Sequence, residues 1–259
     1  MSIWGKIAGA AAGLALGGPL GALLGAIAGH MFLDRETRRE VERAPQYREE
    51  RVGRDDRGMR ERDEVAFTIG VIALAAKLAK ADGAVTRDEV DVFKRVFPVP
   101  REQEANVGHL FNLAKQDVSG FDSYAQQLAG LFRSRPGVLE DLLDSLFLIA
   151  KADDRLHPGE LEYLRHVSQI FGFSEGEFQR IRASHFGPDH EDPYVILGVE
   201  RTISDEDLKK AYHRLMRENH PDSMIARGVP EEFVKLANEK VAAINGAYDI
   251  VKKQRGIVG

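Results

Sequence analysis

Two groups of polar residues in this sequence could do chemistry, and they lie far apart in the chain. One is the tripeptide His220-Pro221-Asp222, which follows a run of basic residues. The other is a repeated turn, in which Lys80-Ala81-Asp82-Gly83 recurs as Lys151-Ala152-Asp153-Asp154. Neither pairs a nucleophile with a base, and no glycine-rich phosphate loop with its lysine accompanies them. We therefore expect a binding protein and not an enzyme.

The two copies of the repeated turn share a further acidic residue. In each copy a glutamate follows the first aspartate by seven positions, Glu89 after Asp82 and Glu160 after Asp153. These residues suit helix ends, because Gly83 can close one helix and Pro158 can stand in the first turn of the next.

The residues around the tripeptide predict a hairpin of two helices. Ser204 can cap the first helix, which starts with acidic residues and carries one apolar face. Pro221 prevents that helix from continuing, so it should end at Asn219, and Asp222 can turn the chain back. A second amphipathic helix is expected from about Pro230. The basic side of the first helix comprises Lys209, Lys210, His213, Arg214 and Arg217.

With these motifs in place, residues 192–257 resemble a J-domain. The resemblance is carried by Tyr194-x-x-Leu197-Gly198-Val199, Leu208-x-x-Ala211-Tyr212-x-x-Leu215, the tripeptide, and Ile244-x-x-Ala247-Tyr248. It implies that the module stimulates the ATPase of an Hsp70-type chaperone. The contacts that it implies are His220, Pro221, Asp222, Lys209, Lys210, Arg214 and Arg217. Ser223 and Glu218 stand where J-domains often have a basic residue, which implies a weaker affinity for the chaperone. A J-like fold that has lost this coupling is an alternative.

Residues 65–187 show seven successive apolar faces with helical spacing and no strand alternation of any length. The pattern predicts a helical domain with short loops. With its two Lys-Ala-Asp turns, this part resembles the TerB, or tellurite-resistance-like, domain. That resemblance implies a helical bundle with acidic clusters that can bind divalent cations, whose oxygen ligands must converge on one place. The candidate ligands that it implies in this chain are Asp82, Glu89, Asp153, Asp154 and Glu160. Helix caps and turns, and a surface that docks a partner, are the other interpretations of these residues. A cation-binding or signalling scaffold is accordingly the alternative function.

The first 33 residues predict a membrane helix. No charge occurs between Ile7 and Gly29, which is longer than the about 20 residues that a spanning helix needs. A cleaved signal peptide and a helix buried in or lying on a soluble domain are the alternatives. A glycine at every fourth position permits close helix pairing, so we expect a homodimer. The glycines at this expected interface are Gly9, Gly13, Gly17, Gly21 and Gly25.

The charges that flank the apolar segment predict its orientation. Only Lys6 precedes the segment, whereas several arginines follow it within residues 34–64. The positive-inside rule then places the N-terminus outside and the remaining domains in the cytoplasm, as a single-pass protein of the bacterial inner membrane. Residues 34–64 hold mixed charges and little apolar material, so we expect a tether.

The whole sequence therefore predicts an all-α protein in four parts: an anchor (1–33), a tether (34–64), a TerB-like domain (65–187) and a J-domain (192–257). The absence of cysteine excludes disulfides and cysteine zinc sites, and the net charge of −5 gives no reason to expect nucleic acid. This order of parts resembles the DjlA-type membrane-anchored co-chaperones of Gram-negative bacteria. No cofactor is expected beyond the possible divalent cation.

Overall fold

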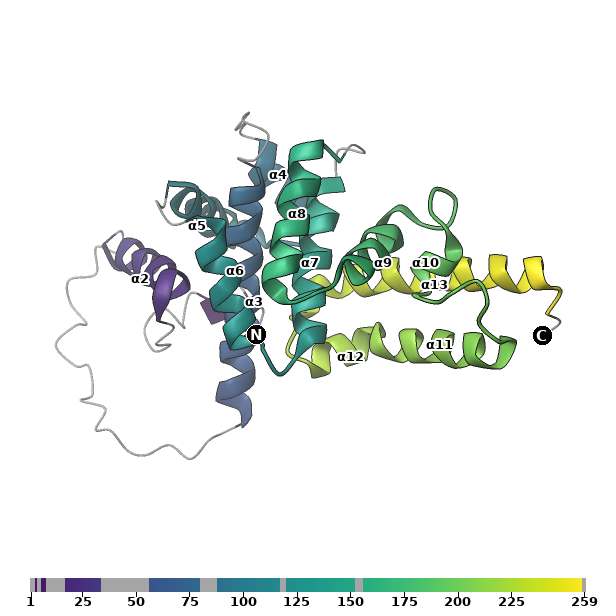
Figure 1. Cartoon of the computed structure of the whole chain (residues 1–259). Helices are drawn as coiled ribbons and strands as arrows, with labels where there is room; N and C mark the ends of the chain where they lie inside the picture. The colour runs from purple at the N-terminus through teal and green to yellow at the C-terminus, as the bar shows by residue number, and fades with distance from the viewer. Residues whose placement is uncertain are drawn as a thin grey trace.

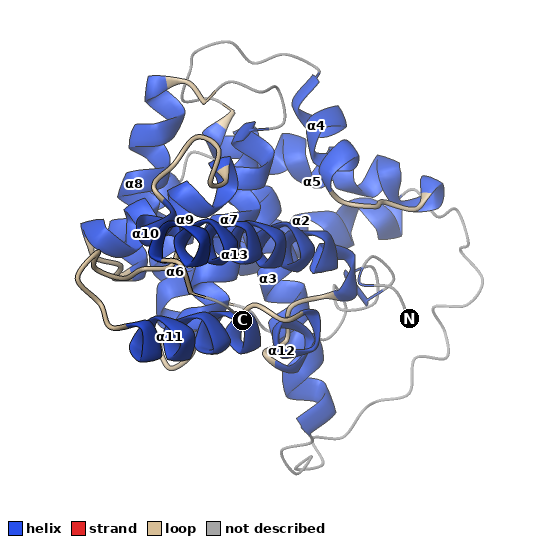
Figure 2. Cartoon of the chain, turned by 90° about the vertical axis from the view of Figure 1, so that its right-hand side faces the viewer, coloured by secondary structure: helices blue, strands red, loops and turns tan. Residues whose placement is uncertain are grey.

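The computed structural model describes residues 3, 6–7, 17–33, 56–79, 88–116, 120–151 and 156–257. In this part of the chain every regular element is a helix (Figure 2), as the sequence predicts. The helices form a bundle at the centre of the molecule, and a helical hairpin extends from one side of it (Figure 1).

Among the described residues, seven α-helices of the bundle correspond to the seven predicted apolar faces. They are α3 (Asp56–Leu78), α4 (Asp88–Val96), α5 (Glu104–Gln116), α6 (Phe121–Leu131), α7 (Pro136–Ala150), α8 (Pro158–Phe171) and α9 (Glu175–Phe186). The central helix, α3, contacts α5, α6, α7 and α8. Its residues from Val65 to Ala76 are almost all fully buried, including the small Ala and Gly residues that let its neighbours approach closely.

Helix α3 begins at Asp56, inside the segment that the sequence assigned to the tether. The side chains of residues 58–62 are exposed, and ion pairs hold the turn that follows them. Asp63 is 5% exposed and accepts a hydrogen bond of 2.6 Å from Arg135, at the start of α7. Glu64 pairs with Lys6. The mixed charges that suggested a tether therefore include residues that build the end of the bundle.

The described part of the glycine-rich segment is helix α2 (Gly18–Leu33), which lies beside α5 and α6. Leu20, Leu23 and Leu24 are buried, and the backbone N–H of Leu20 donates to Gln127 of α6 at 3.0 Å. Among the described residues, none of the helices combines the length and the apolar character that spanning a bilayer requires. Gly9 and Gly13 of the expected dimer interface lie outside the described residues, whereas Gly17, Gly21 and Gly25 are at the start of α2 or within it.

The C-terminal module consists of α10 (Pro193–Ile196), α11 (Asp205–Glu218), α12 (Pro221–Ala226) and α13 (Val234–Arg255). The predicted caps are present: the N–H of Tyr194 donates to Asp192 at 3.0 Å, and that of Asp207 donates to Ser204 at 3.1 Å. Gly198 ends the turn after α10 with a φ of 62°, which glycine adopts without a steric penalty.

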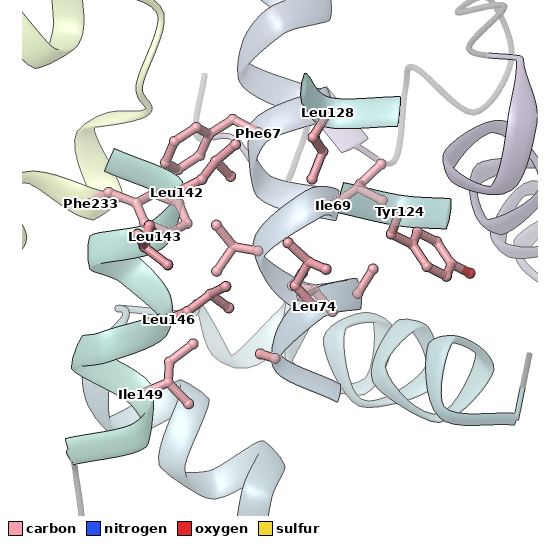
Figure 3. Close-up of a cluster of buried hydrophobic side chains, with 14 of the residues drawn as sticks. Phe67, Ile69, Leu74, Tyr124, Leu128, Leu142, Leu143, Leu146, Ile149 and Phe233 are labelled. Atoms are coloured by element: carbon pink, nitrogen blue, oxygen red, sulfur yellow. The ribbon is translucent and has the colours of Figure 1, made fainter. Parts of the chain in front are cut away.

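Helix α13 belongs to two hydrophobic cores at once. Its first residues, including Leu236 and Ala237, pack into the core of the bundle, together with Phe233 just before the helix. Its later residues, Ile244, Ala247 and Val251, pack against α10 and α11 in a second, smaller core. Figure 3 shows Phe233 beside Phe67 and Leu142 of the bundle. The packing therefore continues across the boundary that the sequence placed near residue 190.

Candidate functional site

The tripeptide lies where helix α11 ends and helix α12 begins. Asn219 closes α11, and its side-chain amide donates to the carbonyl of Leu215 at 2.9 Å. His220 then caps α12: its Nδ1 accepts a hydrogen bond of 3.2 Å from the N–H of Asp222. This bond requires an unprotonated Nδ1. Pro221, expected only to stop a helix, is the first residue of a new one, a position that its fixed φ favours.

The His220 and Asp222 side chains of the tripeptide are accessible. The side chain of His220 is 55% exposed and that of Asp222 is 88% exposed, and Nδ1 of His220 lies 3.6 Å from a carboxylate oxygen of Asp222. Ser223 is engaged locally, because its hydroxyl donates to the carbonyl of Arg217 at 2.6 Å. Ser223 therefore takes part in fastening α12 to the end of α11, in addition to lacking the positive charge that is common at this position.

The predicted basic face of α11 is exposed, but its members differ in how they are paired. Lys210 bonds to Glu206 at 2.8 Å and to Asp207 at 3.2 Å, and these hydrogen bonds raise its pKa. Arg214 lies 4.0 Å from Glu218. Lys209 and Arg217 form no ion pair with the described residues. The face therefore presents two cations that are already partly neutralised and two that are not.

A depression of about 780 Å³ connects the basic face with the tripeptide. Its walls bring together Lys210, Arg217 and His220, three of the residues implied by the resemblance, whereas Lys209 and Arg214 do not line it. The other lining residues are His213, Met216 and Ser223. The depression can receive a side chain of a partner that approaches along α11.

Helix α13 supports α11 from behind. Tyr212 and Tyr248 stack with their ring centroids 4.0 Å apart and their planes 9° apart. The hydroxyl of Tyr212 also donates to Asn245 of α13 at 2.9 Å. The motif residues Tyr212 and Tyr248 thus hold the two helices of the hairpin in register, while Leu208 and Leu215 fill the space between them.

The structure does not test the candidate cation site. Asp82, Asp153 and Asp154 lie outside the described residues, and of Glu89 only the backbone is described, in α4. Glu160 accepts a hydrogen bond of 2.8 Å from the N–H of His157, as expected of a residue that caps the start of α8. Within the described ranges, His, Asp and Glu side chains form no group of three that could hold a metal ion.

Sequence reasoning missed a buried ionic cluster that joins the bundle to the C-terminal module. Glu140, Asp141 and Asp144 of α7 face Arg227 and Lys240 of the module. Lys240 is 2% exposed and bonds to Glu140 at 2.8 Å and to Asp144 at 2.6 Å. In the sequence of α7 the three acidic residues are interspersed among the apolar ones, so no pattern marks them as a cluster. Their cationic partners in the C-terminal module lie 86 to 100 positions away. A buried lysine on an otherwise apolar stripe is the signal that could have indicated such a contact.

Burial and charge shift the pKa values of this cluster. Burial opposes the charged forms of Glu140 and Lys240, but their attraction outweighs it, assisted by Arg180 for Glu140 and by Asp144 for Lys240. The pKa of Glu140 is consequently lowered and that of Lys240 is raised. For Asp141 burial prevails and raises the pKa to about 7, against the effect of Lys240 and Arg227.

Three family models match the chain. Residues 1–49 match the co-chaperone DjlA transmembrane domain, residues 68–183 match the tellurite resistance protein TerB, and residues 192–256 match the DnaJ domain. The first match indicates a membrane-anchored protein. All three fall in the order that the sequence analysis expected.

Curated relatives match over most of the chain. A co-chaperone protein DjlA from Vibrio vulnificus is 30% identical over 99% of both chains. One from Photobacterium profundum is 29% identical over 98% of this chain and 99% of its own, and one from Coxiella burnetii is 28% identical over 70% of this chain and 74% of its own. No solved structure matches the chain significantly.

Proposed function

Since the chain belongs to the DjlA family of J-domain co-chaperones, we propose that it stimulates ATP hydrolysis by a DnaK-type Hsp70 chaperone through His220, Pro221 and Asp222. The observation that carries this proposal is the placement of the tripeptide. It is exposed at the start of α12, and a depression joins it to the basic face of α11. One partner can therefore contact both at once.

The two parts of this surface have different roles in the proposed mechanism. The cations of α11 steer and orient an acidic surface of the chaperone, an effect that falls with ionic strength. The tripeptide then binds more tightly to the chaperone conformation that hydrolyses ATP than to the other. Such differential affinity shifts the population towards the hydrolysing state without any covalent step in this chain.

The transmembrane match at residues 1–49 supports action at a membrane surface. We propose that the N-terminus lies outside and that the bundle and the J-domain lie in the cytoplasm of the inner membrane, where the chaperone and ATP are found. Pairing of two chains through the glycine stripe remains part of the proposal. A divalent-cation-binding or signalling scaffold that acts through the TerB-like domain is the alternative role.

The proposal is tested by single-turnover ATP hydrolysis by a DnaK-type chaperone, with the full chain in detergent or lipid discs. We expect His220→Gln to abolish the stimulation. The matched control is His166→Gln, because His166 lies on α8 and is 53% exposed, close to the 55% of His220. Full stimulation by His220→Gln would refute the proposed mechanism.

A further inference from the structure

Arg227 connects three elements that meet near the tripeptide. It closes α12, and one of its terminal nitrogens donates to the carbonyl of Glu218, the last residue of α11, at 2.6 Å. The rest of the guanidinium reaches the bundle and donates to both oxygens of Asp141 on α7, at 2.8 and 3.1 Å from Nη2 and at 3.2 Å from Nε. The tripeptide therefore lies between two helix ends that one side chain fastens to α7.

Asp141 depends on this contact more than its acidic neighbours do. Glu140 also bonds to Arg180, and Asp144 also bonds to His185 at 2.7 Å, so both keep a partner within the bundle. For the carboxylate of Asp141, which is 1% exposed, the hydrogen-bond donors among the described residues all belong to Arg227. A buried carboxylate without its cation is strongly disfavoured, so Asp141 and Arg227 hold each other in place.

The contact leaves the proposed chaperone surface open. The contacts between the bundle and the C-terminal module include Arg227, Phe233 and Lys240, whereas His220, Asp222 and the cations of α11 stay exposed. Figure 1 shows α12 against the lower end of α7, with α11 extending away from the bundle. The contact between the bundle and the C-terminal module therefore leaves the tripeptide accessible.

We propose that Asp141 is a positioning residue: through Arg227 it fixes the geometry between the ends of α11 and α12, so that the TerB-like bundle sets how strongly the tripeptide acts on the chaperone. The inference rests on the proposed function. The relevant geometry is local, since a bidentate guanidinium–carboxylate pair restricts both distance and plane. Because burial raises the pKa of Asp141 to about 7, the ionised pair is best studied at about pH 8.

The experiment compares Asp141→Asn and Arg227→Lys in the single-turnover assay with full-length protein at that pH. Lysine keeps the charge of Arg227 but loses the planar fork, and it cannot reach Asp141 and Glu218 in the same way. We expect both variants to reduce the maximal stimulation by about fivefold or more, with a much smaller change in the half-maximal concentration. That concentration is set mainly by the unaltered basic face. Amide hydrogen exchange of residues 218–227 should become faster in both.

The control is Arg201→Lys, because Arg201 pairs with Asp192 at 2.7 Å within the same module and its side chain is 68% exposed. His220→Gln in the same assay separates the two proposals. If His220→Gln stimulates normally, the proposed function fails. If His220→Gln is inactive while Asp141→Asn and Arg227→Lys stimulate and exchange like the Arg201→Lys control, the positioning role fails and the proposed function stands.

Discussion

At the scale of the residue, the cations of the proposed docking face differ in whether they already form an ion pair within this chain. Arg217 has no ion pair among the described residues, whereas Arg214 lies within 4.0 Å of Glu218. A partner must compete with Glu218 for Arg214 but meets Arg217 as an uncompensated charge. The sequence alone does not show which of these two arginines contributes more to docking, because both are predicted on the same basic side of one helix.

We expect Arg217→Ala to raise the chaperone concentration that gives half-maximal ATPase stimulation by about two- to fivefold, and Arg214→Ala to raise it less. Titrations at low and high salt measure this, and the difference should shrink as salt screens both charges. Equal effects of the two substitutions would show that pairing with Glu218 has no influence on docking.

Glu140 should make the stability of the protein depend on pH in the acid range. Burial disfavours its charge, but Lys240 and Arg180 prevail and lower its pKa below the ordinary 4.5. The ionised carboxylate therefore stabilises the fold above about pH 4.5, and this contribution is lost as the pH falls towards the lowered pKa. Asp141 acts in the opposite sense. Because its pKa is raised, the contribution of Asp141 to the free energy of unfolding falls as the pH rises from about 4 to 7.

The expected result is that Glu140→Gln melts at a lower temperature than the unchanged protein at neutral pH, and that the difference narrows from about pH 5 to pH 3. Thermal melts followed by circular dichroism provide the measurement. Glu162→Gln is the control, since its carboxylate is 76% exposed. A difference for Glu140→Gln that stays constant over this range would contradict the assigned shift.

At the scale of the element, the bundle depends on the close approach of α3 and α6. A Cβ atom at Gly70 would lie 2.7 and 2.9 Å from the two methyl carbons of Leu128, which is fully buried. Leu128 cannot move aside without displacing its neighbours in the core shown in Figure 3. The glycine is therefore required by packing, although its backbone is ordinary helix.

We expect Gly70→Ala to lower the free energy of unfolding by about 1–3 kcal/mol, because overpacking outweighs the gain in helix propensity. Chemical denaturation measures this. Gly130→Ala, also in a helix of the bundle but with open space around the added methyl group, should be neutral or stabilising. A stabilising effect of Gly70→Ala would mean that α3 and α6 can separate at no cost.

At the scale of the whole molecule, the bundle and the J-domain share a core. The ring of Phe233 lies 5.0 Å from that of Phe67 in α3 and 4.3 Å from that of Phe97, which directly follows α4. Because the N-terminal half of α13 follows directly, the J-domain cannot separate from the bundle without exposing this ring and the charge of Lys240. The two family modules should behave as one cooperative unit.

Phe233→Ala is accordingly expected to destabilise the bundle itself, by about 3–5 kcal/mol. Denaturation of the unchanged full chain should show a single transition, and amide hydrogen exchange in α3 and in α13 should report that same transition. The control is Phe173→Ala, at the edge of the same core and partly exposed, which should cost less. Two separate transitions, with α3 unaffected by Phe233→Ala, would show independent domains.

The sequence alone was sufficient to predict the helical class, the seven faces of the bundle, the caps at Asp192 and Ser204, and the identity of the J-domain. These features are local, because each depends on residues within a few turns of one another. It did not reveal that α3 begins at Asp56 or that Pro221 starts a helix, since charge composition and a lone proline are each compatible with several conformations.

How the modules meet became apparent from the three-dimensional packing alone. Asp141 finds its partner 86 positions away, and Glu140 finds Lys240 after 100. Ion pairs of this kind leave no periodicity in the sequence, because each charge only has to reach its partner in space. The tripeptide could be identified from the residues that surround it in the sequence, whereas its attachment to α7 through Arg227 depends on the packing of the whole chain.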